Sequence, residues 1–282
     1  MPMNAEDPAG FLRDTTAWAS TAGGTPTLRG RRRARAGTTL HFVHGNGLCA
    51  GVYAPLLLDL ARDHGLFCHD LEGHGDSDRP ARLGDPGGAV RRIRAVIDEQ
   101  GLRDQPLIGI GHSHGAALTM LSAARDPSLF KALVLLDPIL LPPAVWLVSR
   151  GLGLVGGNPM ARSAARRRDR WPDAAAVSAH LHDRGVYRGW TDEAFACFVA
   201  HATREQDGAR VLSCGKDVEA ANFAHPPHPW HAVRKVRCPV LFLHGTHSYP
   251  FMPRAAQLAQ THCASLTVQT QRGGHCFMLE AP

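Results

Sequence analysis

The sequence contains no run of 18 or more consecutive apolar residues, so it predicts no membrane-spanning helix. Residues 1–24 lack the basic start and apolar core of a secretory signal. The seven cysteines show no C-x-x-C spacing, and an odd number without such a framework is typical of reduced thiols. We therefore expect a cytoplasmic protein without a membrane partner.

Lysine is also scarce, because only residues 131, 216 and 235 are lysines and the net charge of +6 comes almost wholly from arginine. The densest basic runs, residues 31–33 and 166–168, are not interleaved with aromatic residues, so nucleic acid is not an expected partner. His225, His228 and His231 are spaced by three in a proline-rich stretch, whereas zinc sites usually need a closer pair on regular structure and a fourth ligand. We expect neither a metal nor a cofactor.

A glycine-rich stretch connects an apolar run, residues 106–110, to a helical pattern at 116–123. Gly111 and Gly115 flank Ser113 at two residues on each side, which is the Gly-x-Ser-x-Gly pattern of a nucleophile elbow. A sharp turn from strand to helix accepts only very small side chains and exposes the serine hydroxyl above the sheet. The pattern predicts a nucleophilic serine, and the alternative is a glycine-rich turn with an incidental serine.

Strand and helix patterns alternate in two separate parts of the chain. Predicted strands are residues 38–43, 66–69, 106–110, 132–136, 239–243 and 265–268, and predicted helices include 51–63, 88–100 and 253–262. Residues 1–36 predict only short edge strands or a loose arm. Between 138 and 237 the alternation stops, and helical pieces at 174–182 and 191–203 are separated by glycine and proline. We predict an α/β fold with a mostly parallel sheet, formed by residues 1–137 and 238–282, and a helical cap of residues 138–237 inserted between them.

Four motifs in this order resemble the α/β-hydrolase fold, specifically its capped members, over about residues 38–137 and 238–282. They are His44-Gly45-Asn46-Gly47, which looks like the oxyanion loop, the D-x-x-G-H-G-x-S signature at 70–77, the elbow around Ser113, and Gly274-His275. The resemblance implies that Ser113 is the nucleophile and His275 the general base. It also implies an oxyanion hole formed by the backbone N–H of His114 and that of Asn46, in the loop after Gly45.

The third member of the triad departs from the usual pattern. Most relatives place an acid on the loop after the strand at 240–243, but residues 245–249 contain no carboxylate. Some capped relatives, including certain dehalogenases and lactone hydrolases, place it at the end of the preceding strand, which implies Asp137. An Asp-Pro at this point is structural in other relatives, and Glu219 is the second candidate.

A serine at the elbow attacks acyl carbon, unlike the aspartate of epoxide hydrolases and haloalkane dehalogenases of this fold. We predict a cofactor-free serine hydrolase that cleaves a small, mostly apolar ester or lactone through an acyl-enzyme. Two alternatives stay open: a C–C bond hydrolase or lyase on the same residues, and a catalytically silent hydrolase-fold protein that binds a ligand.

The expected partner is a small molecule, and a monomer and a homodimer are both open. The predicted wall of the substrate pocket consists of His44, Pro142, Trp146 and Tyr187. Relatives continue beyond the histidine loop into a last helix, whereas this sequence ends at Pro282, so we expect either that the sequence is truncated or that the helix is absent.

Overall fold

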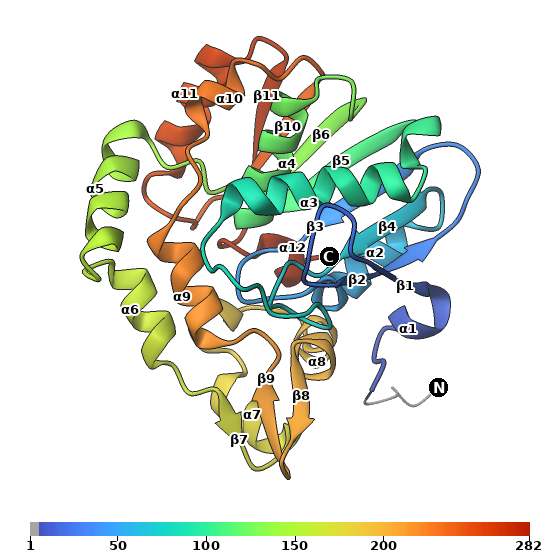
Figure 1. Cartoon of the computed structure of the whole chain (residues 1–282). Coiled ribbons are helices and arrows are strands. Elements are labelled where there is room, and N and C mark those ends of the chain that lie inside the picture. The colour runs from blue at the N-terminus through green and yellow to red at the C-terminus, as the bar shows by residue number, and fades with distance from the viewer. Residues whose placement is uncertain (1–5) are drawn as a thin grey trace.

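The computed structural model describes residues 6–282, which form a twisted sheet with helices on both faces (Figure 1). The strands are β1 Thr16–Ser20, β2 Leu28–Arg33, β3 Thr39–Val43, β4 Gly65–His69, β5 Leu107–His112, β6 Ala132–Leu136, β7 Arg170–Trp171, β8 Thr203–Gln206, β9 Ala209–Leu212, β10 Val240–Gly245 and β11 Leu266–Gln271. The helices are α1 Phe11–Asp14, α2 Ala54–Leu60, α3 Pro86–Glu99, α4 Ser113–Arg125, α5 Pro143–Leu154, α6 Pro159–Arg166, α7 Ala174–Leu181, α8 Asp192–His201, α9 Lys216–Ala224, α10 Trp230–Val233, α11 Met252–His262 and α12 Phe277–Glu280. Short 3₁₀ turns lie at Ala50–Tyr53, Leu102–Asp104 and Gly185–Tyr187.

The main sheet has eight strands in the order β1-β2-β4-β3-β5-β6-β10-β11. The β1–β2 and β2–β4 pairings are antiparallel and the other five pairings are parallel, so the predicted mostly parallel sheet is confirmed. β5 lies near the middle, between β3 and β6. The six strands β4, β3, β5, β6, β10 and β11 are parallel to one another. The loops that follow β3, β5, β6 and β10 therefore all leave the sheet at one edge. The candidate site residues gather at that edge.

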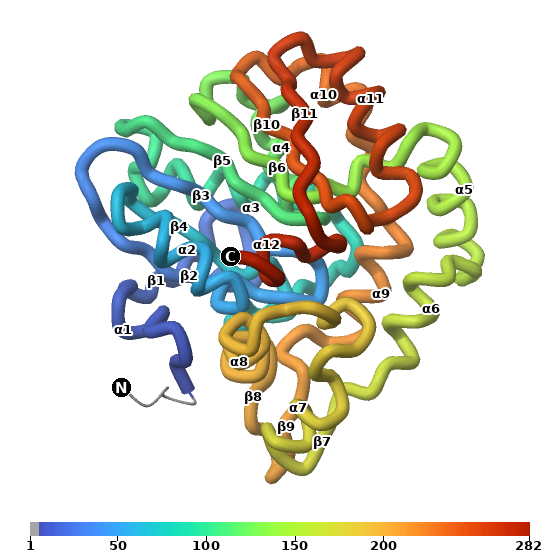
Figure 2. Tube along the Cα trace, turned by 180° about the vertical axis from the view of Figure 1, so that it is seen from behind, coloured from blue at the N-terminus to red at the C-terminus, as the bar shows by residue number. Residues whose placement is uncertain are grey.

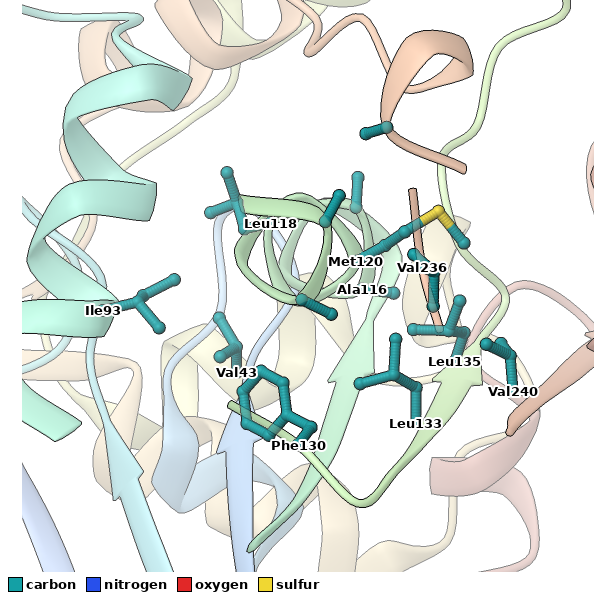
Figure 3. Close-up of a cluster of buried hydrophobic side chains, with 14 of the residues drawn as sticks. Val43, Ile93, Ala116, Leu118, Met120, Phe130, Leu133, Leu135, Val236 and Val240 are labelled. Atoms are coloured by element: carbon teal, nitrogen blue, oxygen red, sulfur yellow. The ribbon is translucent and has the colours of Figure 1, made fainter. Parts of the chain in front are cut away.

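Two apolar clusters cover the two faces of the sheet. One face packs against α3, α4, α10 and α11, with Leu118 and Met120 of α4 set among strand residues such as Val43 and Leu133 (Figure 3). The other face packs against α2, α8 and α12, where Phe198 of α8 and Phe277 of α12 are buried. The central strand β6 is continuously apolar, as expected for a parallel strand that is covered on both sides.

The predicted helix over residues 51–63 is divided into two parts in the structure. A 3₁₀ turn at Ala50–Tyr53 precedes α2, which ends at Leu60, and Pro55 lies in the first turn of α2. Proline is tolerated there because the first helical N–H groups have no intrahelical partner. Tyr53 is thereby fixed between the two elements, fully buried.

The chain leaves the sheet after β6 and returns at β10, and residues 138–237 between them are called the inserted segment below. It contains α5 to α10, but it also contains a three-stranded antiparallel sheet in the order β7-β9-β8, which the prediction of a purely helical cap missed. β8 and β9 are joined by Asp207-Gly208, both with positive φ, 50° and 67°. Asp-Gly is a strong signal for a two-residue hairpin, so the sequence did contain the information.

The N-terminal arm contributes the edge strands β1 and β2, as predicted for short edge strands. Residues 1–5 lie outside the described part of the chain. All seven cysteines are buried and unpaired. Within residues 6–282, no helix has the length and apolar character that a membrane crossing requires.

His41, in the middle of β3, is a buried histidine whose two ring nitrogens contact no hydrogen-bond partner in the described residues. Its ring lies against Phe67 and Phe130, with ring centroids 5.8 and 5.9 Å away. Burial, assisted by the nearby His69, lowers the pKa of His41 well below its usual value. His41 therefore stays neutral in the folded protein at pH values where it is protonated in the unfolded chain.

We predict that His41→Phe makes the protein less sensitive to acid. Below about pH 6.5 the unfolded chain binds a proton at this position and the folded protein does not, so the free energy of unfolding falls as the pH falls. The substitution removes a slope of about 1.4 kcal/mol per pH unit below pH 6.5. Urea unfolding between pH 8 and pH 5 measures this slope. The same change at the exposed His247 is the control, and equal slopes for wild type and His41→Phe would contradict the prediction.

Candidate functional site

The turn from β5 into α4 places Ser113 at the carboxyl edge of the sheet. Ser113 has φ 56°, a left-handed conformation that is costly for a residue with a side chain. A Cβ atom on Gly115 would lie 2.3 Å from the carbonyl oxygens of Val43 and His44, and one on Gly111 would lie 2.6 Å from Cα of Ala116. Glycine at 115 is therefore required by the close approach of α4 to β3, and glycine at 111 by the close approach of α4 to β5.

Ser113, His275 and Asp137 form a continuous line of hydrogen bonds. The Nε2 atom of His275 lies 2.9 Å from Oγ of Ser113, and its Nδ1 atom lies 2.5 Å from Oδ2 of Asp137. These three residues come from the loops after β5, β11 and β6, so the sheet brings together positions up to 162 residues apart in the chain. A base within hydrogen-bond reach of a nucleophile, and a carboxylate that orients it, is the geometry of an activated serine.

Asp137 is fully buried and has a φ of 45° at the end of β6. Its Oδ1 atom accepts the backbone N–H of Gly245 at 2.9 Å, and the Ser248 hydroxyl donates to Oδ2. The loop after β10 thus contributes hydrogen-bond donors to the carboxylate. Glu219, the other carboxylate that the sequence offered, is bound to Arg167 instead, so its position does not support a role as the acid.

Gly45 and Asn46 follow β3, and His114 lies in the first turn of α4, where N–H groups have no intrahelical partner. The backbone N–H of Asn46 donates to no group within residues 6–282. The Asn46 side chain is held by α9, because it donates to the carbonyl of Glu219 at 3.0 Å and accepts from Asn222 at 2.9 Å. Asn46 and His114 line the same cavity as Ser113, and His114 lies at the positive end of the α4 dipole.

A chain of hydrogen bonds through Tyr53 and His112 was not predicted from the sequence. The Gly45 N–H donates to the Tyr53 hydroxyl at 3.2 Å, that hydroxyl lies 2.6 Å from Nδ1 of His112, and Nε2 of His112 lies 3.0 Å from the carbonyl oxygen of His275. Burial lowers the pKa of His112 to about 3, so its ring is neutral and carries one N–H. Since the carbonyl of His275 can only accept, Nε2 donates and Nδ1 accepts the Tyr53 proton. No motif marks Tyr53, so its place in this chain could not be read from the sequence.

A cavity of about 570 Å³ lies over Ser113 and His275, between the sheet edge and the inserted segment. Its wall is mainly apolar, with Leu48, Ile139, Leu141 and Phe223 among the lining residues. The lining also includes Asn46, Gly45 and His114. Tyr187, a predicted wall residue, lines the cavity as well. Burial lowers the pKa of His114 to about 4, so that ring is neutral as well.

The other three predicted wall residues lie outside the lining of this cavity, which corrects that expectation. His44 is completely buried beneath the loop, where its Nε2 accepts the N–H of Leu71 at 2.8 Å. Trp146 points toward the loop before α10 and donates its indole N–H to the carbonyl of Pro226. Pro142 forms the N-cap of α5.

Arg167 and Glu219 are the only Arg, Lys, Asp or Glu side chains among the described residues that line the cavity, and they bind each other. One guanidinium nitrogen of Arg167 lies 2.9 and 2.7 Å from the two carboxylate oxygens. Burial raises the pKa of Glu219, while the neighbouring Arg167 opposes that rise. Tyr187 lies in the same cluster, and burial raises its pKa to about 12. The pair is neutral overall, so the cavity contains no uncompensated carboxylate or guanidinium.

Comparison with known proteins places the chain in a family. Residues 42–282 match the model of the alpha/beta hydrolase family, and the chain belongs to that family. It is 24% identical over 195 residues to the abhydrolase domain-containing protein AFT2-1 of Alternaria alternata, covering 60% of this chain and 71% of the relative.

Solved structures share the fold over nearly the whole chain. E-2-(acetamidomethylene)succinate hydrolase superposes with a TM-score of 0.79 and 23% identity, covering 95% of both chains. An esterase from Rhodococcus sp. superposes with a TM-score of 0.70 and 24% identity, covering 95% of this chain and 94% of the esterase. The predicted α/β-hydrolase fold is confirmed.

Proposed function

We propose that this protein is a serine hydrolase that cleaves a small, mostly apolar ester or lactone through an acyl-enzyme on Ser113. The observation that carries the proposal is the line of hydrogen bonds from Ser113 through His275 to Asp137, which opens into a mainly apolar cavity. The similarity to a solved esterase is in keeping with acyl chemistry, although it concerns the fold.

In the proposed reaction, Nε2 of His275 accepts the hydroxyl proton as Oγ of Ser113 attacks the acyl carbon. The same proton then passes to the departing alcohol oxygen, and a water molecule repeats the sequence to release the acid. Asp137 holds Nδ1 of His275 and stabilises the imidazolium that forms transiently. The buried carboxylate is already hydrogen-bonded to Gly245 and Ser248, so it is held in place before substrate binds.

The negative charge on the acyl oxygen is assigned to the backbone N–H groups of Asn46 and His114. Both lie at the lining of the cavity, and the positive end of α4 adds to the field at that point. The inserted segment closes over these groups as a cap, and α9 fixes the Asn46 side chain. Fixed donors stabilise the developing charge without having to reorient during the reaction.

The substrate class follows from the cavity. A volume of about 570 Å³ suits a small molecule. The lining is mainly apolar, and its one charged pair, Arg167 and Glu219, compensates itself, which favours an uncharged or weakly polar acyl compound. A serine nucleophile directs attack to a carbonyl carbon, which esters and lactones provide.

We predict that a fluorophosphonate labels the wild-type protein once at neutral pH and does not label Ser113→Ala. The activated hydroxyl is the group that forms the phosphonate ester, and intact-mass spectrometry detects the adduct. Ser163→Ala, which removes another serine that lines the cavity, is the matched control and retains labelling. Absence of labelling in the wild type would instead indicate a ligand-binding protein without catalysis.

Asp137→Asn is expected to lower kcat for aryl esters by up to about 10⁴-fold, the size of the equivalent effect in a serine protease. The amide cannot stabilise the imidazolium, although its oxygen can still accept the Gly245 N–H. Placing a carboxylate on the adjoining loop, in the double variant Asp137→Asn with Ser248→Asp, should recover part of this loss because the Ser248 side chain already touches Asp137. Undiminished ester turnover by Asp137→Asn contradicts the assignment.

Turnover of β-diketones in place of esters and lactones would indicate C–C bond hydrolysis.

Tyr53→Phe is expected to lower kcat by about tenfold and to leave KM nearly unchanged, because the Gly45 N–H and Nδ1 of His112 both lose a buried partner. His112→Leu interrupts the same chain, so the double variant should lose little more than either single variant. Steady-state kinetics on one aryl ester give kcat and KM for the wild type, the two single variants and the double variant. Fully multiplicative losses in kcat, or an effect confined to KM, would show that the two residues do not act as a unit.

A further inference from the structure

The exposed large apolar side chains of this protein are concentrated on one part of the inserted segment. Residues 6–282 contain nine such side chains, and seven of them lie on α5, on the turn after it and at the start of α6. These seven residues are called the α5–α6 apolar face: Val145, Leu147, Val148, Leu152, Leu154, Val155 and Met160. Val155, Leu154 and Leu147 are 79, 67 and 66% exposed.

The arrangement of α5 explains why this face is uncovered. One side of the helix lies toward α9: a Cβ on Gly153 would touch the carbonyl of Ala224, and Asn158 binds the Ser149 hydroxyl at 3.0 Å. The opposite side carries Leu147, Val148 and Leu152. α5 and α6 lie at the outer margin of the molecule in both views (Figures 1 and 2). None of the twelve residues of α5 is buried.

The same stretch of chain is strongly basic. Residues 138–168 contain five arginines and no aspartate or glutamate. Arg167 is paired inside the cavity, whereas Arg162 and Arg166 are exposed, one helical turn apart on α6, and form no ion pair with any residue of the described chain. An exposed apolar face is therefore followed along the chain by exposed arginines that form no ion pair within the described residues.

We propose that the α5–α6 apolar face docks on the surface of a bilayer that contains anionic phospholipid. Aliphatic side chains inserted at the level of the headgroups, with arginines at the lipid phosphates, are the combination by which proteins bind such an interface. A second copy of the chain fits less well, because a two-fold contact between identical faces brings the arginines of the two copies together. A folded protein partner would have to match both the aliphatic side chains and the arginines, whereas an anionic bilayer presents acyl chains and phosphates together.

Docking in this way gives the cavity a particular orientation. Val145 and Met160 belong both to the α5–α6 apolar face and to the lining of the cavity, and Ser149 and Ser163 line it beside them. The entrance to the cavity therefore lies at the lipid boundary when the face is docked. If the proposed hydrolase function holds, its apolar substrate reaches Ser113 from the lipid phase. The proposed contact is peripheral, so it requires no membrane-spanning helix.

The test is co-sedimentation of the full chain with sucrose-loaded vesicles at low salt. We expect binding to vesicles of phosphatidylglycerol and phosphatidylcholine, and little binding to phosphatidylcholine alone. Leu147→Glu combined with Leu154→Glu should weaken binding at least tenfold, since it places charge in the inserted surface. Leu12→Glu, at an exposed leucine on α1, is the matched control and should bind like the wild type. Arg162→Gln and Arg166→Gln should each weaken binding by about fivefold.

Three outcomes overturn the proposal. The first is an absence of wild-type binding to phosphatidylglycerol vesicles at low salt, and the second is an equal loss of binding in the Leu12→Glu control. The third is a wild-type dimer in light scattering that the double glutamate variant converts to a monomer, which assigns the face to contact between copies. None of them depends on catalysis, because Leu147 and Leu154 do not line the cavity, so fluorophosphonate labelling of the double variant in solution reports separately on the proposed hydrolase site.

Discussion

The close approach of β3 and α4 at the carboxyl edge of the sheet is the constraint on which the site depends. The backbone of α4 begins so near the carbonyl oxygens of Val43 and His44 that position 115 has no space for a Cβ atom. That proximity forces the turn at Ser113 into a left-handed conformation. It also places the loop after β3 beside the first turn of α4, so that the amides of Asn46 and His114 come from two elements that the sheet holds in register. The strain at one residue is thus maintained by packing over a large area, since α4 is buried along almost its whole length.

Hydrogen bonds around this turn also hold the neighbouring loops in place. Gly45, Tyr53, His112 and the carbonyl of His275 form one series, in which the direction of every hydrogen bond is fixed. Because burial keeps His112 neutral, the direction of the series does not change over the ordinary pH range. The loop after β3 and the loop after β11 are therefore linked through the residue next to Ser113. In the proposed mechanism, the oxyanion donors and the general base are positioned by one connected structure.

The sequence predicted those features that follow from local patterns. Apolar runs marked the strands, and glycines two residues on each side of Ser113 marked the turn, because both depend on neighbours along the chain. Tyr53 could not be found in this way, since its partner His112 is 59 residues distant and neither belongs to a spaced pattern. The predicted wall residues His44 and Trp146 failed for a related reason: an aromatic or polar side chain near a motif can face the core, and only the packing decides. The hairpin at Asp207-Gly208 is different, because its signal is local and is present in the sequence.

The loop after β10 contributes to the site although it contains no acid. The loop after β10 has no carboxylate, yet Gly245 and Ser248 in that loop both donate to Asp137 from the adjacent strand β6. A buried carboxylate without such donors would carry a large desolvation cost. With them, and with Nδ1 of His275 at 2.5 Å, its negative charge is supported on both oxygens. β6 and β10 are adjacent and parallel, so a carboxylate at the end of either strand can approach the same imidazole nitrogen. The geometry therefore accommodates the acid on either strand, provided that the other strand's loop supplies the donors.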